Sequence, residues 1–137
     1  MIIRKAEIKD YEAIADFSKK VAMHHVENRP DILKNAPDLS KKEFKDTLKD
    51  KNWLILIAEN DEKPVGHCKA LIREIGDEYW TPMKLLYIYE MYVDSDFRRH
   101  GVANKLLDEA KKNRQRNRCN SNRIGRVVVQ RAGSQSL

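Results

Sequence analysis

The sequence predicts an α+β domain built on a mostly antiparallel mixed sheet with flanking helices. Two apolar runs with strand composition, residues 53–58 and 84–93, stand out, and both lack Gly and Pro. Helical spacing of apolar residues occurs instead after residue 10, after residue 40 and after residue 101. The expected order is strand, two helices, three strands and a helix, which favours an α+β arrangement over an alternating parallel sheet.

The first strand is expected at residues 2–8, and Asp10 is a plausible N-cap for the helix that follows it. This helix runs to about residue 25, before Pro30 breaks the pattern. Its apolar face carries a set of residues at helical spacing: Tyr11, Ile14, Phe17, Ser18 and Val21. Ser40, with Glu43 three residues later, predicts a capping box and a second, short helix that buries Phe44 and Leu48.

Residues 53–58 form a nearly continuous apolar run, which is typical of a central strand. A polar turn at residues 60–63 leads into another strand that starts at Pro64 and continues to Ile72, so the pair reads as an antiparallel hairpin. A loop at residues 76–82 precedes the strand at 84–93. The last helix follows Gly101 and carries a set of small or apolar residues on one face: Val102, Leu106, Leu107 and Ala110.

Length and composition restrict the class of protein. A chain of 137 residues forms one small domain, without an apolar run of membrane-spanning length or a secretory signal at residues 1–5. Cys68 and Cys119 are isolated, which indicates neither a disulfide framework nor a metal site, and Cys68 fits a small core residue. We therefore expect a cytoplasmic protein without a membrane partner.

The net charge of +6 is concentrated at the end of the chain. Residues 111–137 carry eight of the 27 basic residues and none of the 21 acidic ones, so residues 1–110 have a net charge of −2. A basic arm that binds nucleic acid is one reading, whose affinity should fall steeply with salt. Because the excess is confined to the tail, we do not expect nucleic acid to be the main partner.

The most informative motif is a basic, Gly-containing loop between the strand at 84–93 and the last helix. It comprises Arg98, Arg99, His100, Gly101, Val102 and Ala103. Free backbone N–H groups and the positive end of the helix dipole meet there, which favours an anion such as a diphosphate. Neither of the two better-known Gly-rich phosphate loops occurs among the five glycines.

The loop and the order of elements before it resemble the GCN5-related N-acetyltransferase (GNAT) family over residues 1–112. The family pattern [QR]-x-x-G-x-[GA] is present as Arg98-x-x-Gly101-x-Ala103, in the expected place, and residues 93–97 look like the family's approach to it. The resemblance implies an acetyl-CoA-dependent transfer of an acetyl group to a primary amine. It also implies that residues 98–103 hold the CoA pyrophosphate, with Arg98 and Arg99 adding charge.

In the family, the pantetheine arm pairs like an extra strand with the strand before this loop. The resemblance therefore assigns Met91, Tyr92 and Val93 to that pairing, with a backbone amide near them stabilising the oxyanion. Glu90 is the candidate general base, because the amine must be neutral to attack; a solvated strand carboxylate or an ion-pair partner is the alternative. By period two, Tyr87 and Tyr89 are expected on the opposite face from Glu90.

The acceptor is a small-molecule or peptide amine whose identity has no decisive motif. His25, Tyr79 and Trp80 are candidate substrate contacts, although core packing explains Trp80 equally well. His24 and His25 also lie at a helix end, where the dipole favours a histidine.

The resemblance stops after Lys112. The family continues with a strand, a helix and two further strands, with an Asn for CoA and a Tyr that protonates the leaving thiolate. None of these is recognisable in the basic tail, residues 113–137. We interpret the domain as truncated or frameshifted there, with impaired activity. An acyl-CoA-binding or interaction module with a basic arm, without catalysis, is the alternative.

A frameshift is testable against the genetic code. An adenine run can encode Lys111-Lys112-Asn113. If one base of that run is removed, the codons that follow can be read as Ile-Gly-Lys-Glu-Ile-Gly-Val-Thr-Val-Ile-Glu-Leu-Asp-Val-Trp, which looks like the missing family strand. Of the tail itself, only residues 126–130 have strand character. We expect them to pair with the strand at 84–93 or with another chain, and an exposed edge there would favour a homodimer.

Overall fold

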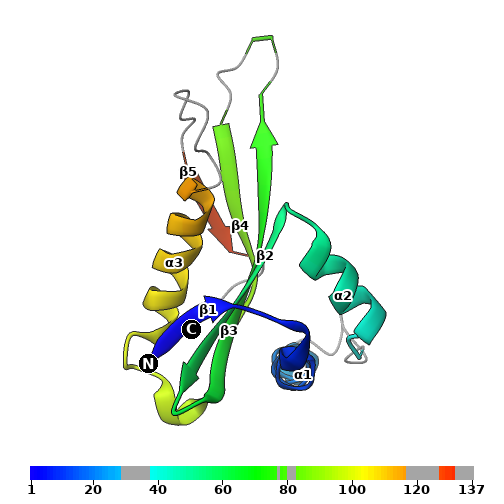
Figure 1. The fold of residues 1–137 in the computed structure, drawn as a ribbon, viewed down its shortest axis with the longest axis vertical. Coiled ribbons are helices and arrows are strands. Elements are labelled where there is room, and N and C mark those ends of the chain that lie inside the picture. Colours follow the sequence, from blue (N-terminus) through cyan, green and yellow to red (C-terminus); the bar gives the residue numbers. More distant parts are fainter. Residues whose placement is uncertain (29–37, 77, 80–82, 117–126, 132–137) are drawn as a thin grey trace.

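A single sheet organises the molecule (Figure 1). The computed structural model describes residues 1–28, 38–76, 78–79, 83–116 and 127–131. The strands lie in the order β1 (Ile2–Lys5), β2 (Trp53–Asn60), β3 (Lys63–Ile75), β4 (Met83–Val93) and β5 (Val127–Arg131). The first four pair antiparallel, whereas β5 runs parallel to β4. The predicted mixed sheet and the pairing of the tail with the fourth strand are therefore confirmed.

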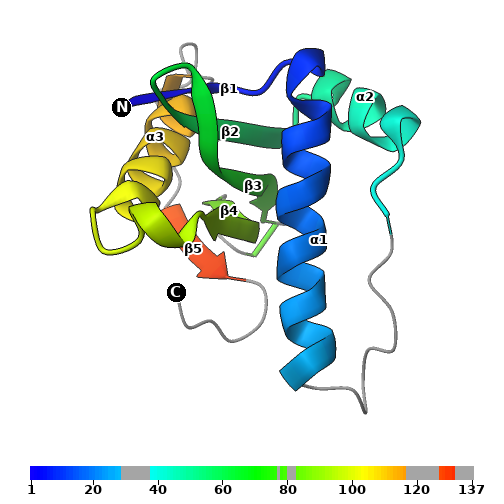
Figure 2. The ribbon, with the colours of Figure 1, turned by 90° about the horizontal axis from the view of Figure 1, so that it is seen from below.

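Helices cover both faces of this sheet (Figure 2). α1 (Tyr11–Asn28) and α2 (Lys41–Lys49) lie on one side, and α3 (Val102–Arg116) lies on the other. Ser40 caps α2 as predicted, because its Oγ accepts a hydrogen bond of 3.0 Å from the Glu43 N–H. Within the described residues, no helix has the length and apolar composition needed to cross a membrane.

The start of α1 differs from the prediction. A 3-10 turn at Ile8–Asp10 precedes it, so the first strand ends at Lys5. Asp10 does not cap α1; its carboxylate accepts from the Glu7 N–H at 2.8 Å and pairs with both terminal nitrogens of Arg4 at 2.8 Å. The reason is that the Asp10 carboxylate is already bound by the Arg4 guanidinium of β1 and by the Glu7 N–H, both of which precede it in the chain.

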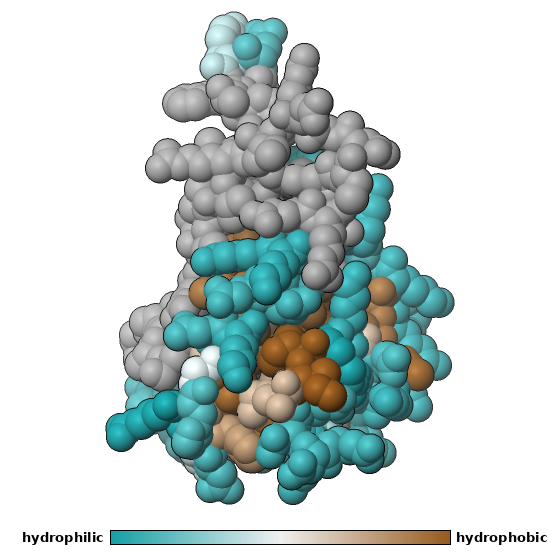
Figure 3. Space-filling model, turned by 60° about the vertical axis from the view of Figure 1, so that its left-hand side comes forward, coloured by the Kyte–Doolittle hydropathy of each residue, from teal (hydrophilic) through white to brown (hydrophobic). Residues whose placement is uncertain are grey.

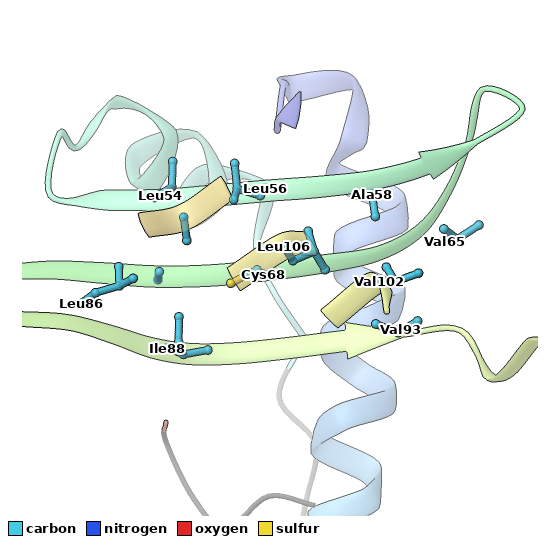
Figure 4. Close-up of a cluster of buried hydrophobic side chains, with 12 residues drawn as sticks. Leu54, Leu56, Ala58, Val65, Cys68, Leu86, Ile88, Val93, Val102 and Leu106 are labelled. Atoms are coloured by element: carbon cyan, nitrogen blue, oxygen red, sulfur yellow. The ribbon is translucent and has the colours of Figure 1, made fainter. Parts of the chain in front are cut away.

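The two faces of the sheet have separate apolar cores. The side toward α3 is the larger, and its buried residues come from β2, β3, β4 and α3 (Figure 4): Leu54, Leu56, Ala58, Val65, Cys68, Ala70, Leu86, Ile88, Val93, Val102, Leu106 and Ala110. The side toward α1 and α2 buries a smaller cluster, Ile14, Phe44, Ile55 and Ile57. Seen from the side of α3, the space-filling view shows an apolar patch bordered by hydrophilic residues (Figure 3).

A tight hairpin joins β2 to β3. Both residues of its turn are left-handed, with φ of 52° at Asp61 and 65° at Glu62. Two consecutive positive φ values define a type I′ turn, whose twist matches that of the flanking strands. The predicted hairpin is confirmed, although the turn uses two acidic residues where Asn-Gly is usual.

Candidate active site

The site is centred on an irregularity in β4. Lys69 of β3 lies opposite Glu90, and the next residue of β3, Ala70, lies opposite Ile88, so Tyr89 is left without a partner. This is a β-bulge, which bends the strand and changes which face the following side chains take. Before it, Ile88 belongs to the core under α3; after it, Glu90 reaches α1.

β5 follows β4 only as far as the bulge. Its register runs from Lys84 opposite Val127 to Ile88 opposite Arg131. Among the described residues, no strand pairs with residues 89–93 on the side away from β3. As far as the described part of the chain shows, the second half of β4 has an open edge.

Main-chain groups on this open edge can be assigned from the ladder. The Asp94 N–H donates to the Val65 carbonyl at 2.8 Å, and residues along an antiparallel strand alternate between the two sides. Tyr92 accordingly directs its carbonyl toward β3. The Tyr92 carbonyl oxygen lies 2.6 Å from the position that a Cβ atom on Gly66 would occupy. Of the predicted edge residues, Met91 and Val93 thus present N–H and C=O groups outward, and the Val93 carbonyl accepts from Arg98 Nε at 2.9 Å.

The predicted anion loop lies at the end of this edge. The Gly101 carbonyl accepts the first intrahelical bond of α3, from the Lys105 N–H at 3.0 Å, so the amides of residues 102–104 have no partner within the helix. Arg99 and Gly101 both have positive φ, 68° and 78°. A Cβ at Gly101 would meet no atom within 4 Å, so open space lies beside the backbone.

The side chains of this loop divide between solvent and core. Arg98, Arg99 and His100 are exposed, whereas Val102 is buried in the core under α3 and Ala103 packs against it. The loop therefore presents exposed cations and amide groups, and apolar packing fixes its backbone in place. This combination suits a polyanionic ligand.

Glu90 is held by two residues from other elements. One of its carboxylate oxygens accepts from Ser18 Oγ of α1 at 2.6 Å and lies 2.8 Å from Nε2 of His67 on β3. Burial of the carboxylate works to raise its pKa, but the hydrogen bond and charge of His67, the Ser18 hydroxyl and the charge of Lys69 outweigh burial, so the pKa lies below its ordinary value. Glu90 is thus ionised at neutral pH.

His67 is fully buried, and within the described structure one of its two ring nitrogens makes no hydrogen bond. Its ring stacks on Phe17 at a centroid distance of 5.6 Å, and its Nδ1 has no hydrogen-bond partner in the described structure. Phe17 also stacks on Tyr92 at 4.9 Å. Neither His67 nor Ser18 was predicted as a site residue; the only signal was a serine within the apolar face of the first helix.

An aromatic cluster borders the base on the same face of the sheet. Trp53 and Tyr89 meet edge-on with centroids 5.6 Å apart, and Tyr87 lies 6.5 Å from Tyr89. Lys69 Nζ lies 5.0 Å from the Trp53 ring and 5.2 Å from the Tyr89 ring. The prediction that Tyr87 and Tyr89 take the opposite face from Glu90 is wrong, because the bulge interrupts the two-residue alternation on which it rested.

The three candidate substrate contacts have different positions. Tyr79 is 84% exposed in the loop before β4. His25 lies in the last turns of α1, but its side chain is outside the described structure, and Trp80 lies outside the described residues. Of the two helix-end histidines, His24 is exposed and contacts the Asn28 side chain. The described residues contain no group of three potential metal ligands.

The chain belongs to the GNAT family of acetyltransferases. The family model for the acetyltransferase (GNAT) domain matches residues 51–134, which include the bulge, the anion loop and β5. The match extends beyond residue 112 into the tail. The family resemblance predicted from the loop motif is thereby confirmed, and with it the class of enzyme, an N-acetyltransferase.

Solved structures agree on the fold. A tetramutant of the BH1408 protein from Bacillus halodurans is 20% identical, with a TM-score of 0.82, covering 98% of this chain and 83% of that one. An acetyltransferase from Vibrio fischeri is 19% identical, with a TM-score of 0.73 and 96% coverage of both chains. The aminoglycoside N-acetyltransferase AAC(6')-Iy in complex with CoA is 16% identical, with a TM-score of 0.66, covering 97% of this chain and 79% of that one.

Proposed function

We propose that this protein transfers the acetyl group of acetyl-CoA to a primary amine, with Glu90 as the general base. The observation that carries the proposal is the position of Glu90. Its carboxylate is ionised, held by Ser18 and His67, and lies one residue after the bulge where the open edge of β4 begins. A base beside a free strand edge and an anion loop provides the parts that acyl transfer to an amine needs.

The loop and the open edge fit CoA by their own chemistry. Amides 102–104, the exposed guanidinium groups of Arg98 and Arg99 and the space beside Gly101 suit a pyrophosphate. The outward N–H and C=O groups of Met91 and the outward N–H of Val93 suit the amides of a pantetheine arm, which can pair as a strand does. Acetyl-CoA supplies an activated thioester; the chain holds and orients it.

The proton path follows from the Glu90 contacts. The Glu90 carboxylate accepts a proton from the attacking ammonium, directly or through water, and His67 at 2.8 Å holds the carboxylate in place. An outward N–H of the β4 edge is available to stabilise the oxyanion. Tyr92 keeps its phenol protonated, since burial and the nearby Asp94 raise its pKa against the opposing charge of Lys20.

The acceptor class is a small-molecule or peptide amine. Aminoglycoside acetyltransferases among the structural neighbours, one of them in complex with sisomicin, support a small polyamine-like molecule. We infer that Tyr79, its sequence neighbour Trp80, and His25 at the end of α1 contribute to its selection.

We further propose that turnover is impaired by the tail. Residues 113–137 contain no Tyr, Trp, Phe, Asp or Glu, so they hold no phenol that could protonate the thiolate. A change of reading frame near Lys112 accounts for that composition, and the coding DNA around this codon tests it: absence of an adenine-run anomaly relative to full-length relatives contradicts the frameshift. With catalysis lost altogether, the chain would act as an acyl-CoA-binding module.

Two measurements on the full chain test the function. Calorimetric titration with CoA should show binding that is lost in Gly101→Val, because a β-branched side chain resists φ near +78° and fills the open space. Thiol release from acetyl-CoA should then be followed with an aminoglycoside, a polyamine and a peptide amine. Binding without thiol release supports the non-catalytic module, and absence of CoA binding contradicts both.

A further inference from the structure

We propose that Lys69 is a self-acetylation site, at which the protein modifies its own side chain with acetyl-CoA in the absence of an external amine. The proposal rests on the proposed function, because the same base and thioester carry it out. It adds a modification site within the chain, on the strand next to the base.

Position is the first argument. Lys69 is the direct Cα partner of Glu90 across the β3–β4 ladder, so the two side chains leave the sheet on the same face as neighbours. The Lys69 charge acts on Glu90, where it helps to lower the pKa of the carboxyl group. Opposite Glu90, Lys69 is thus the amine that this chain presents next to its own base.

The surroundings of Lys69 are the second argument. Its ammonium lies over the rings of Trp53 and Tyr89, at 5.0 and 5.2 Å, and within the described residues no carboxylate lies within 4 Å of it. Two rings therefore hold it in a defined place without an ion pair. Lys20 differs, because it is paired with Asp16 at 2.9 Å on the surface of α1.

The reaction balances without a further reagent. The Lys69 ammonium gives one proton to Glu90 through water, because the two groups are not in direct contact, and the neutral Nζ bonds to the acetyl carbonyl carbon. The carbon–sulfur bond breaks, Nζ loses its second proton to solvent as the amide forms, and the CoA thiolate takes up a proton from solvent. The products are an acetyl-lysine amide, CoA thiol and, once Glu90 returns its proton to solvent, one released proton.

The modification has a consequence for the base. Acetylation removes the positive charge beside Glu90 and replaces a cation over two rings by a neutral amide. Because the rings favour the ammonium form, we expect the reaction to be slow. Because Lys69 is the lysine opposite Glu90, we expect the reaction to stop after one acetyl group per chain.

The test uses the full chain with acetyl-CoA and no added amine. Intact-mass spectrometry should show one added acetyl group, and tryptic mapping should show lost cleavage after Lys69. Lys69→Arg should abolish the added mass. Lys63→Arg, an exposed lysine at the start of the same strand, is the matched control and should leave it unchanged.

Two further variants separate self-catalysis from chemical acetylation. Glu90→Gln should slow the modification at least tenfold, and an excess of CoA should compete with it. The proposal is overturned if acetyl groups spread over exposed lysines regardless of Glu90, or if added amines are acetylated while Lys69 stays unmodified. The second result leaves the proposed function intact, whereas absence of transfer to any amine overturns both.

Discussion

The two faces of the sheet contrast in composition. The face under α3 buries a large apolar cluster from three strands and a helix. The face under α1 and α2 has a smaller apolar cluster and, beside it, two polar networks: Glu90 with His67 and Ser18, and Asp10 with Arg4. One face therefore supplies most of the hydrophobic stability, and the other carries the chemistry.

The bulge at Tyr89 allows one strand to serve both faces. Leu86 and Ile88 before it, and Val93 after it, lie in the core under α3, while Glu90 and Tyr92 point to α1. Without the extra residue, Glu90 would share the parity of Leu86 and Ile88 and enter the apolar core. Substitutions on the two faces should consequently have different effects.

The largest expected effect is on stability, at Leu106. This α3 side chain is fully buried under the sheet, and Leu106→Ala should lower the free energy of unfolding by about 3 kcal/mol through lost burial and a cavity. Urea denaturation measures the change. Leu107→Ala, at a half-buried neighbouring position, should cost clearly less; equal losses at the two positions would contradict the assignment of this face.

Glu90→Gln should lower catalytic activity rather than stability. Loss of the base should lower kcat/KM about a hundredfold, equivalent to about 2.7 kcal/mol, while the amide keeps its shape next to His67. Thiol-release kinetics and a thermal melt together measure the two quantities. Unchanged turnover would remove Glu90 from the mechanism, and Ser18→Ala, which removes one hydrogen bond, should have a smaller effect.

The third prediction concerns Asp10 and its dependence on pH. Burial raises the pKa of this carboxyl, but Arg4 and the Glu7 amide lower it more, so it falls below its ordinary 3.8 in the folded chain. Its stabilisation is therefore complete well above pH 3.8 and disappears as the pH falls through the lower folded value. Asp10→Asn should cost about 2 kcal/mol at neutral pH, because a charge-assisted bidentate pair is lost.

Urea denaturation of wild type and Asp10→Asn across a pH series measures this difference, which should shrink toward acid. Asp16→Asn is the matched control, since Asp16 pairs with Lys20 with both side chains exposed, and its effect should stay below about 0.5 kcal/mol. A difference that is constant with pH would contradict the role of the charge.

The smallest expected effect lies in the turn, away from both faces. Glu62→Gly should raise the free energy of unfolding by about 0.5 kcal/mol, because Gly accepts φ of 65° without strain and its larger unfolded-state entropy offsets only part of that gain. Thermal and urea denaturation measure it. Glu62→Ala, which keeps the strained φ, should bring no gain.

Local patterns predicted most of this architecture. The apolar run of β2, the Ser40 cap and the loop from Arg98 to Ala103 each depend on neighbours in sequence, and the structure has all three where they were expected. The tail strand was likewise expected from its valines, and it pairs with β4.

The rest of the site depends on pairings that are distant in sequence. Ser18 and His67 converge on Glu90 across 72 and 23 residues, and no local spacing marks either as its partner. The bulge depends on the register between β3 and β4, so strict alternation misplaced Tyr87 and Tyr89. The sequence position of Asp10 predicted a helix cap, but its carboxylate pairs with Arg4 of β1, which is a stronger partner.

Within the described residues, β5 pairs with β4 only as far as Ile88, opposite Arg131, and we therefore predict a link between ligand occupancy and self-association. The outward N–H and C=O groups of Met91 and the outward N–H of Val93 are a short template for any strand, including one from a second copy. A ligand that covers those groups competes with such a copy, and by thermodynamic linkage dimerisation must weaken ligand binding by the same factor. The chain would then be most prone to associate when CoA is scarce, which sedimentation with and without CoA can show.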